Sequence, residues 1–361
     1  MADQEELATT CSFAVTVSPP DPVCPAPLHG KSEDALPVPI SWPLPTIPNT
    51  PAGAISCTPM SGSAFPVGVS TVTCTVDWTS VPTTADEAAP PTSCGFTVTI
   101  APPDPELRLT RFLAFGDSIT EGFVSDAFLT GGINPVDIPT ILRGRGSQSL
   151  GVVSQAVEPF SSYPSQLMNL LTTAYATQII VVTNNGISGE HASQGDARLS
   201  SSLSSFQPDV LLLLEGFNDI NFFQSQQPPG SSVNISPIAD NLRSMVQTAE
   251  SRGIEVLLAT LTPVTSVRET VDPGTQAAID DLNDEIHRMA PDLGDGGIVD
   301  LYAAFEGVPG LIGADGFHPT RAGYRRIADV FLQEIQARFD VTARAPNSLS
   351  KRRLLSRKQR K

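Results

Sequence analysis

The sequence Arg111-Phe112-Leu113-Ala114-Phe115-Gly116-Asp117-Ser118 decides the fold of the larger part of this 361-residue chain. Its apolar run predicts a strand that is buried on both faces, and the Gly-Asp pair predicts a sharp turn at the end of that strand. Asp209–Leu214, with four consecutive leucines, predicts a second strand of the same kind. Because such strands need helices on both sides of their sheet, the two runs indicate an α/β protein.

Segments with strand-like and helix-like periodicity alternate around these two runs. Since alternating strands and helices build a parallel sheet, we predict a three-layer α/β/α domain with a five-stranded parallel sheet and right-handed crossovers. Ligands of such sheets bind beyond the carboxyl ends of the strands. The other strands are predicted at 178–183, 254–260 and 298–301, and the main helices at 165–175, 193–206, 237–252, 275–289 and 320–339.

Polar clusters follow the predicted strands at their carboxyl ends. Gly116–Ser118 follows the first strand, Asn184–Gly189 the second and Gly216–Asp219 the third. Asp315–Pro319 follows the fifth strand and precedes the last helix. We therefore expect these four clusters to meet at one edge of one sheet.

The residue types in these clusters complement one another chemically. Ser118 is a candidate nucleophile, and a serine hydroxyl needs an adjacent base, which His318 can supply. Asp315 can hold the other ring nitrogen and stabilise the imidazolium. The oxyanion of a tetrahedral intermediate needs donors, and the candidates are the Ser118 and Gly189 backbone N–H groups and the Asn218 side-chain amide.

These blocks resemble the SGNH (GDSL-type) hydrolase family, in which serine, glycine, asparagine and histidine lie in four sequence blocks. The matching residues are Ser118, Gly189, Asn218 and His318, with Asp315 in the Asp-x-x-His pair. The resemblance covers about residues 107–340. It implies an esterase or lipase that needs no metal and no organic cofactor. The Gly-x-Ser-x-Gly motif is absent, so the nucleophile elbow of ordinary α/β-hydrolases is not predicted.

Four further residues are candidates for the walls of the substrate site: Phe123, His191, Phe222 and Phe223. Residues 123–162 show little helical or strand periodicity, which is typical of a binding loop or lid. The phenylalanines have two interpretations, contact with an acyl group or aromatic ester, and packing of the loops onto the domain. For His191, the alternative to lining the substrate site is a role at the surface.

The first hundred residues contain a repeat. The sequence at 9–22 returns at 92–105 with nine of fourteen positions identical, and both copies end in Pro-Pro-Asp-Pro. The alternation within each copy predicts a closing β-strand followed by a stiff linker. With further strands predicted at 55–58 and 70–76, the pattern indicates an all-β sandwich.

This segment resembles the hyalin repeat, an immunoglobulin-like module of extracellular proteins. The resemblance covers about residues 24–101, and residues 1–18 then look like the tail of a preceding copy. It rests on Cys24-Pro25-Ala26, Cys57-Thr58-Pro59, Ser63–Gly68, Thr71–Thr75 and Cys94–Thr99.

The cysteines all lie before residue 106. Cys24, Cys57, Cys74 and Cys94 can pair in three ways, among which the sequence does not choose. Cys11 matches Cys94 of the next copy and is left without a partner. Cysteines concentrated in one segment are typical of an exported protein, although no signal peptide is recognisable at the start of this sequence.

The charge is unevenly distributed. The net charge of −16 disfavours nucleic acid as a partner, and no run of about 18 apolar residues predicts a transmembrane segment. The terminal KRRLLSRKQRK carries seven basic residues and no acid, so we interpret 341–361 as a basic flexible tail. The predicted organisation is a repeat tail (1–18), a β-sandwich module (19–101), a linker (102–106), a hydrolase domain (107–340) and this tail.

Two functional hypotheses follow. The first is a secreted, monomeric serine esterase that hydrolyses short-chain acyl or acetyl esters, with carbohydrate O-acetylesterase and lipase as alternatives within the same family. The second is an adhesion or glycan-binding protein with a vestigial hydrolase domain. In either case the β module is a candidate for contact with a glycan or a protein.

Overall fold

The computed structural model describes residues 22–46, 55–77, 93–126 and 154–342. The chain divides into two compact units, Met1–Asp104 and Pro105–Lys361, and the division falls inside the linker predicted at 102–106. Three features named above lie outside the described residues: the repeat tail at 1–18, which includes Cys11, most of the predicted lid, and the basic residues from 343 onward.

The first unit is built from short strands, as its sequence predicts. Its four-stranded sheet has the order β1-β6-β5-β3, and β2 and β4 form a two-stranded sheet. β6 pairs antiparallel with β5 and parallel with β1. The strands are β1 (Leu28–Lys31), β2 (Val38–Pro39), β3 (Ile55–Thr58), β4 (Ala64–Phe65), β5 (Gly68–Val76) and β6 (Ser93–Ala101).

The core of this unit surrounds Trp42, whose ring centroid lies 5.9 Å from that of Phe65 and 5.3 Å from that of Phe96. Two disulfides, Cys24–Cys94 and Cys57–Cys74, select one of the three pairings that the sequence allowed. The second joins the paired strands β3 and β5, whereas the first ties residues 70 positions apart. The immunoglobulin-like sandwich and the hyalin repeat stay predictions.

The second unit has five parallel strands in the order β10-β7-β11-β12-β13, which confirms the predicted sheet. The central strand β11 (Val210–Leu214) lies between β7 (Arg111–Gly116) and β12 (Glu255–Ala259). β10 (Val181–Gly186) and β13 (Gly297–Val299) form the two edges. Because β7 and β11 are both enclosed by neighbours, the two apolar runs of the sequence form the middle of the sheet.

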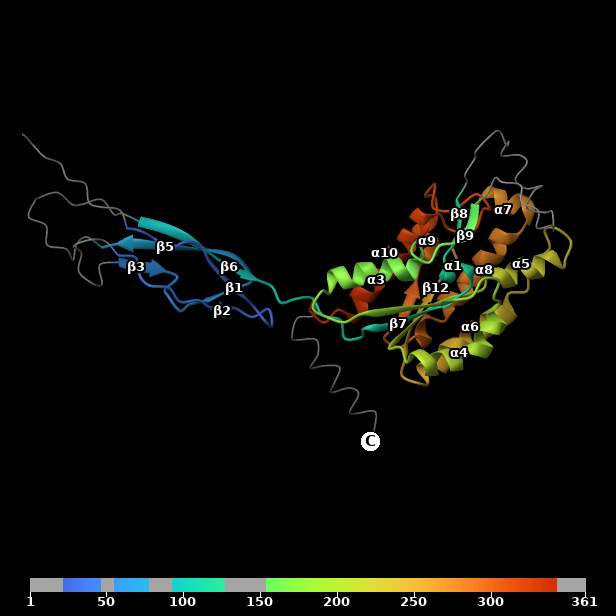
Figure 1. Cartoon of the computed structure of the whole chain (residues 1–361), viewed down its shortest axis with the longest axis horizontal. Helices are drawn as coiled ribbons and strands as arrows, with labels where there is room; N and C mark the ends of the chain where they lie inside the picture. The colour runs from blue at the N-terminus through green and yellow to red at the C-terminus, as the bar shows by residue number, and fades with distance from the viewer. Residues whose placement is uncertain (1–21, 47–54, 78–92, 127–153, 343–361) are drawn as a thin grey trace, which may run out of the picture. The chain divides into compact units, whose positions relative to one another are not determined.

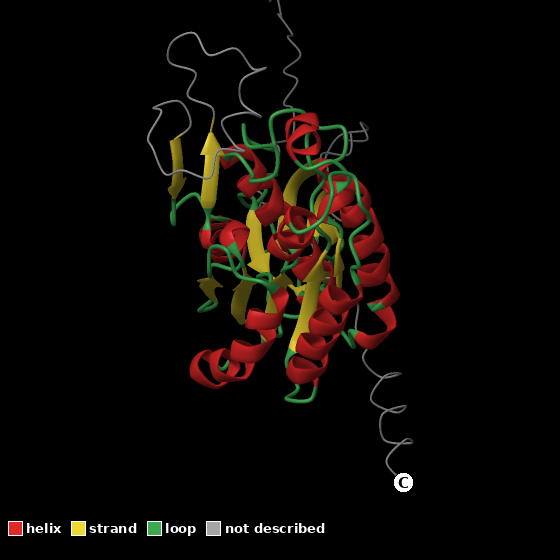
Figure 2. Cartoon of the chain, turned by 90° about the vertical axis from the view of Figure 1, so that its right-hand side faces the viewer, coloured by secondary structure: helices red, strands yellow, loops and turns green. Residues whose placement is uncertain are grey.

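Helices cover both faces of this sheet (Figures 1 and 2). α3 packs against α10 on one side, and α4 packs against α6, which also contacts α8, on the other. Within the described residues, none of the helices combines the length and the apolar character that crossing a membrane requires. The helices are α1 (Ser118–Glu121), α3 (Tyr163–Ala174), α4 (Ala192–Phe206), α5 (Phe217–Ser225), α6 (Ser236–Glu250), α7 (Ser266–Val271), α8 (Thr275–Arg288), η3 (Ala290–Asp292), α9 (Leu301–Phe305) and α10 (Arg321–Phe339).

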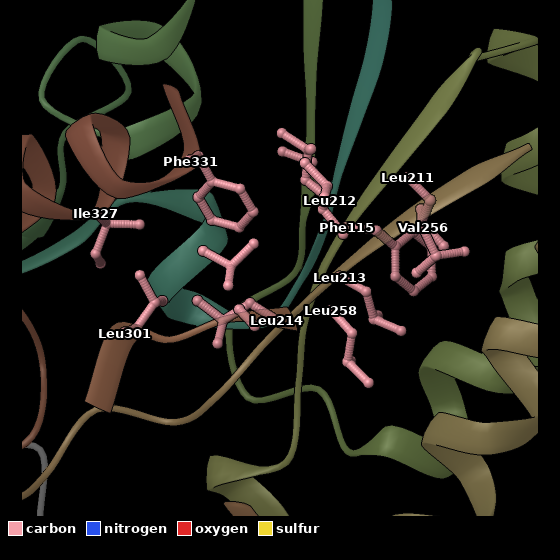
Figure 3. Close-up of a cluster of buried hydrophobic side chains, with 14 of the residues drawn as sticks. Phe115, Leu211, Leu212, Leu213, Leu214, Val256, Leu258, Leu301, Ile327 and Phe331 are labelled. Atoms are coloured by element: carbon pink, nitrogen blue, oxygen red, sulfur yellow. The ribbon is translucent and has the colours of Figure 1, made fainter. Parts of the chain in front are cut away.

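The core of the second unit gathers on the two faces of the central strands. All five residues of β11 are buried, and side chains of β7, β12 and α10 pack around them (Figure 3). At about 25 cal/mol per Å² of apolar surface removed from water, this burial is the main stabilising contribution to the unit. The packing of this core also fixes the positions of the strand ends at which the polar clusters lie.

Three local predictions need correction. The second strand is Val181–Gly186 instead of 178–183, because the Gln178 side chain hydrogen-bonds the backbone of Leu107 through both its atoms, at 2.8 and 2.9 Å, before the strand begins. The cluster at 184–186 therefore lies inside the strand. The helix predicted from 165 starts at Tyr163, since proline is favoured in a first helical turn.

The third correction concerns residues 123–162, which were predicted to have little regular structure. The two ends of this segment, β8 (Phe123–Asp126) and β9 (Ser154–Val157), pair as antiparallel strands. Each strand has only four residues, too few for alternation to be recognised in the sequence. Whether the part between them is a lid stays a prediction, because 127–153 lie outside the described residues.

Candidate active site

Ser118 lies directly beyond the carboxyl end of β7, at the first position of the short helix α1. A Cβ on Gly116 would stand 2.0 Å from the Leu214 carbonyl oxygen, so only glycine allows β7 and β11 to approach this closely at the turn. The Asp117 carboxylate accepts the Ile119 N–H at 2.9 Å and caps α1. Strand end, glycine and cap together fix the Ser118 side chain, which is 6% exposed.

His318 and Asp315 lie close to Ser118 in space, although they come from the C-terminal part of the second unit. The Ser118 Oγ lies 2.9 Å from His318 Nε2, and His318 Nδ1 lies 2.7 Å from Asp315 Oδ2. The second carboxylate oxygen, Oδ1, accepts the backbone N–H groups of Phe317 and His318 at 3.2 and 3.0 Å. A hydroxyl, an imidazole and a carboxylate thus form one hydrogen-bonded chain, although Ser118 and His318 are 200 residues apart.

The β8–β9 hairpin holds the loop that carries Asp315. The Ser125 backbone oxygen accepts the Ala314 N–H at 3.0 Å, and its hydroxyl accepts the Asp315 N–H at 3.2 Å. On the other side, Gly316 adopts a φ of +86°, and its carbonyl accepts the Thr265 N–H at 2.9 Å. Part of the segment that was predicted to lack regular structure therefore anchors the loop that carries Asp315 and His318.

Gly189 and Asn218, the other candidate oxyanion donors, follow β10 and β11. Gly189 has a φ of +80°, a conformation that favours glycine, and a Cβ there would meet open space. The Asn218 Nδ2 donates to the Glu190 carbonyl oxygen at 2.9 Å and to Asp117 Oδ2 at 3.4 Å. The second of these contacts is long for a hydrogen bond. The amide of Asn218 therefore lies between the Ser118 turn and the residue that follows Gly189.

The candidate wall residues fall into two groups. The Phe123 ring lies over His318, with centroids 4.5 Å apart, so it flanks the imidazole. His191, at the start of α4, contacts Phe222 on α5 edge-to-face at 5.3 Å, and Phe222 contacts Phe223 at 5.9 Å. The His191 ring also lies 3.7 Å from Asp219. Contact with substrate stays a prediction for both groups.

Buried carboxylates lie beneath these residues, and the sequence did not indicate them. Asp117, Glu190, Glu215 and Asp219 are each at most 6% exposed. Burial raises the pKa of Asp117 to about 7, raises that of Glu215 well above its usual range, and also raises that of Asp219. Neither carboxyl oxygen of Glu215 has a hydrogen-bond partner. The apolar run before Glu215 was the available signal, because it places this glutamate at the end of the central strand.

Other ligand-binding features around the site include one pocket in the part of the chain that the structure describes. Among the residues that the structure describes, no three histidine, cysteine or carboxylate side chains gather as metal ligands would. A polar pocket lies beside α5, and neither Ser118, Asp315 nor His318 contributes to it. It is lined by Gln224, Ser225, Gln227, Pro228, Pro229, Gly230, Ser231, Val271, Asp272 and Pro273.

Comparison with known proteins identifies a family whose model matches this chain. A model described as the GDSL-like lipase/acylhydrolase family matches residues 114–326. An acetylxylan esterase from Geobacillus stearothermophilus is 26% identical over 200 residues, which cover 54% of this chain and 86% of the relative.

Solved structures also resemble this chain. A lipase/acylhydrolase from Enterococcus faecalis is 22% identical and gives a TM-score of 0.47, covering 64% of this chain and 97% of that chain. The structure of an acetylxylan esterase from Geobacillus stearothermophilus is 23% identical and gives a TM-score of 0.44, covering 63% of this chain and 94% of that chain.

Proposed function

The chain belongs to the GDSL-like lipase/acylhydrolase family and is a carboxylic ester hydrolase, and we propose that it is a serine esterase with a Ser118–His318–Asp315 triad. One observation carries this proposal, the unbroken hydrogen-bonded chain from the Ser118 hydroxyl through the imidazole to the Asp315 carboxylate. A buried carboxylate beside a histidine ring favours the imidazolium that a general base becomes after it takes up a proton.

In the acylation step, the Ser118 Oγ attacks the ester carbonyl carbon while His318 Nε2 takes the hydroxyl proton. The Asp315 carboxylate stabilises the resulting imidazolium across the 2.7 Å contact. When the tetrahedral intermediate collapses, the bond to the alcohol oxygen breaks and His318 returns the proton to that oxygen. The alcohol leaves, and an acyl group remains bound to Ser118.

The negative charge on the tetrahedral oxygen needs hydrogen-bond donors that are already in place. We assign this role to the backbone N–H groups of Ser118 and Gly189 and to the Asn218 amide. The Ser118 N–H stands at the start of α1, where a helix offers no internal acceptor. Asn218 can redirect the hydrogen that makes the long 3.4 Å contact with Asp117 and keep its shorter bond to the Glu190 carbonyl.

In the deacylation step, a water molecule attacks the acyl carbon while His318 accepts one of its protons. The same donors stabilise the second tetrahedral intermediate. Its collapse breaks the bond to Ser118 Oγ, which regains a proton from His318, and a carboxylic acid is released. The cycle balances without a metal or an organic cofactor.

For the substrate we propose short-chain esters, with acetyl groups on polysaccharides as the physiological target. Two observations support this choice: the similarity to an acetylxylan esterase, and the Phe123 ring beside His318, with ring centroids 4.5 Å apart. Long-chain lipids are the alternative. A series of 4-nitrophenyl esters from acetate to palmitate, run beside acetylated xylan, separates the two, because a lipase would prefer the longer chains.

We further propose that the protein works outside the reducing cytosol and that its first unit is a hyalin-repeat-like, immunoglobulin-like module that contacts a glycan or protein. The two disulfides of that unit support the compartment, since such bonds persist in oxidising environments. Removal of the first unit would then lower activity on insoluble acetylated xylan while leaving the hydrolysis of 4-nitrophenyl acetate unchanged.

The mechanism is tested by Ser118→Ala, with Ser251→Ala as the matched control. Ser251 ends α6, and its hydroxyl only donates to the Thr248 carbonyl at 2.9 Å. We expect Ser118→Ala to lower kcat for 4-nitrophenyl acetate by at least about 10⁴-fold and Ser251→Ala to leave it unchanged. Hydrolysis that survives in Ser118→Ala, after correction for the uncatalysed rate, would refute the assignment of the nucleophile.

A further inference from the structure

Arg198 on α4 connects the end of β10 and the turn that follows it to β7. Its Nε donates to Glu190 Oε1 at 2.6 Å, and its Nη2 binds the other oxygen of the same carboxylate. Its Nη1 donates to Asn185 Oδ1 at 2.7 Å, and Nη2 donates to the Asn185 carbonyl at 2.9 Å. The guanidinium carbon lies 3.8 Å from the centroid of the Phe115 ring on β7. A planar, bidentate group with these contacts holds the residues after β10 against β7.

Glu190 carries this restraint to the candidate oxyanion donors. It follows Gly189 directly in the chain, and its own backbone carbonyl accepts the Asn218 amide at 2.9 Å. Fixing the Glu190 side chain therefore fixes two groups at once, the Gly189 backbone and the acceptor that orients Asn218. The Arg198 guanidinium donates to Glu190, to Asn185 and, at 3.5 Å, to the Gly116 carbonyl, and to neither of these two donors, so its influence on them passes through Glu190.

The charge environment makes this ion pair necessary. Glu190 is buried in the same cluster as Asp117, Glu215 and Asp219, and it raises the pKa of Glu215. A buried carboxylate that loses its cationic partner is strongly unfavourable, so without Arg198 the Glu190 side chain would move toward solvent. That movement would take its backbone carbonyl, and with it the Asn218 amide, out of position.

We propose that Arg198 is a positioning residue for ester hydrolysis, which through Glu190 holds the Gly189 N–H and the Asn218 amide in place for the oxyanion. The inference rests on the proposed serine-esterase function. It predicts that a change at Arg198 affects the transition state, in which the oxyanion is charged, much more than the binding of the neutral ester. A purely structural ion pair would instead reduce the fraction of folded enzyme and leave each active molecule unimpaired.

The test compares Arg198→Lys, Arg198→Ala and Glu190→Gln with the control Arg252→Lys. Arg252 also hydrogen-bonds α4, through the Ser200 carbonyl at 3.1 Å and the Ser204 hydroxyl at 3.2 Å. Active sites are counted by titration with an irreversible phosphonate, and kcat and KM for 4-nitrophenyl acetate are expressed per titrated site. Melting temperatures are recorded in parallel.

For Arg198→Lys and Glu190→Gln we expect kcat per site to fall at least about tenfold, toward the roughly 10²–10³-fold that the loss of one oxyanion donor costs, with KM changed less than about threefold. Added guanidinium ion should partly restore kcat in Arg198→Ala, because the side chain it replaces is 20% exposed and thus open to a small ion. Arg252→Lys should keep the wild-type kcat. These values support the positioning role.

An unchanged kcat per site in Arg198→Lys and Glu190→Gln would overturn the inference and leave a structural ion pair. If Arg198→Ala does not fold, Arg198→Lys and Glu190→Gln still distinguish a positioning role from a structural ion pair. The underlying mechanism fails in a different way, since activity that persists in Ser118→Ala removes the serine-esterase function whatever Arg198 does. An inactive Ser118→Ala beside a fully active Arg198→Lys would refute the positioning role alone.

Discussion

The variant Asp315→Asn tests the electrostatic part of the site with little change in shape. The Asp315 Oδ1 accepts two backbone N–H groups, and an asparagine carbonyl can keep both bonds, so the loop should stay in place. The other oxygen becomes an NH₂ group facing His318 Nδ1. The imidazole must then accept at Nδ1 and carry its proton at Nε2, where it can no longer take the proton of Ser118.

The size of the effect follows from the contact itself. Both side chains are nearly buried, and the carboxylate oxygen and ring nitrogen lie 2.7 Å apart. At an effective dielectric constant of about 20, two unit charges at that separation attract by about 6 kcal/mol. Since 1.36 kcal/mol corresponds to a factor of ten in rate, loss of this attraction lowers kcat by about 10⁴-fold. The same order of magnitude is known for this substitution in another serine hydrolase triad.

The assay measures kcat and KM for 4-nitrophenyl acetate together with the melting temperature. Asp300→Asn is the matched control, because Asp300 caps α9 through the Ala303 N–H at 2.9 Å and is not part of the triad. We expect a loss of about four orders of magnitude in kcat for Asp315→Asn and none for Asp300→Asn. A loss below about tenfold in a normally folded Asp315→Asn would refute the reasoning, since the charge would then contribute little.

Two further predictions concern stability. Burial raises the pKa of Glu215, so the native state keeps a proton that the unfolded state releases, and stability falls as pH rises above about 4–5. Glu215→Gln should therefore have a higher melting temperature than the wild type at pH 8, by roughly 2–4 °C for each kcal/mol of added stability. This difference should shrink toward pH 5. Equal pH profiles of the two melting temperatures would contradict the prediction. Loss of the Cys24–Cys94 disulfide, which spans 70 positions, should destabilise the first unit by about 4 kcal/mol. Because both tryptophans, Trp42 and Trp78, belong to that unit, tryptophan fluorescence should report its earlier unfolding while esterase activity is unaffected.

Much of the fold could be predicted from local sequence patterns. The apolar runs around Phe115 and Leu212 predicted strands buried on both faces, and both strands lie in the interior of the sheet. The positions of Ser118 and Asn218 just beyond these strands could also be predicted from the sequence, because the residues that break the apolar pattern mark the end of a strand. The second strand was displaced by the Gln178 side chain, whose bonds to Leu107 connect residues 71 positions apart. No local pattern contains such a contact.

The sequence by itself determined the division of the chain, the alternation of strands and helices, and the order of the four blocks that hold Ser118, Gly189, Asn218 and His318. These properties depend on neighbouring residues, whose periodicity and turn chemistry are local. Only the tertiary structure decided which cysteines pair and that the β8–β9 hairpin anchors Asp315. It also decided that four carboxylates are buried together and that Arg198 pairs with one of them, Glu190. Burial and charge pairing depend on side chains that lie far apart in the sequence, so they exist only once the chain has folded.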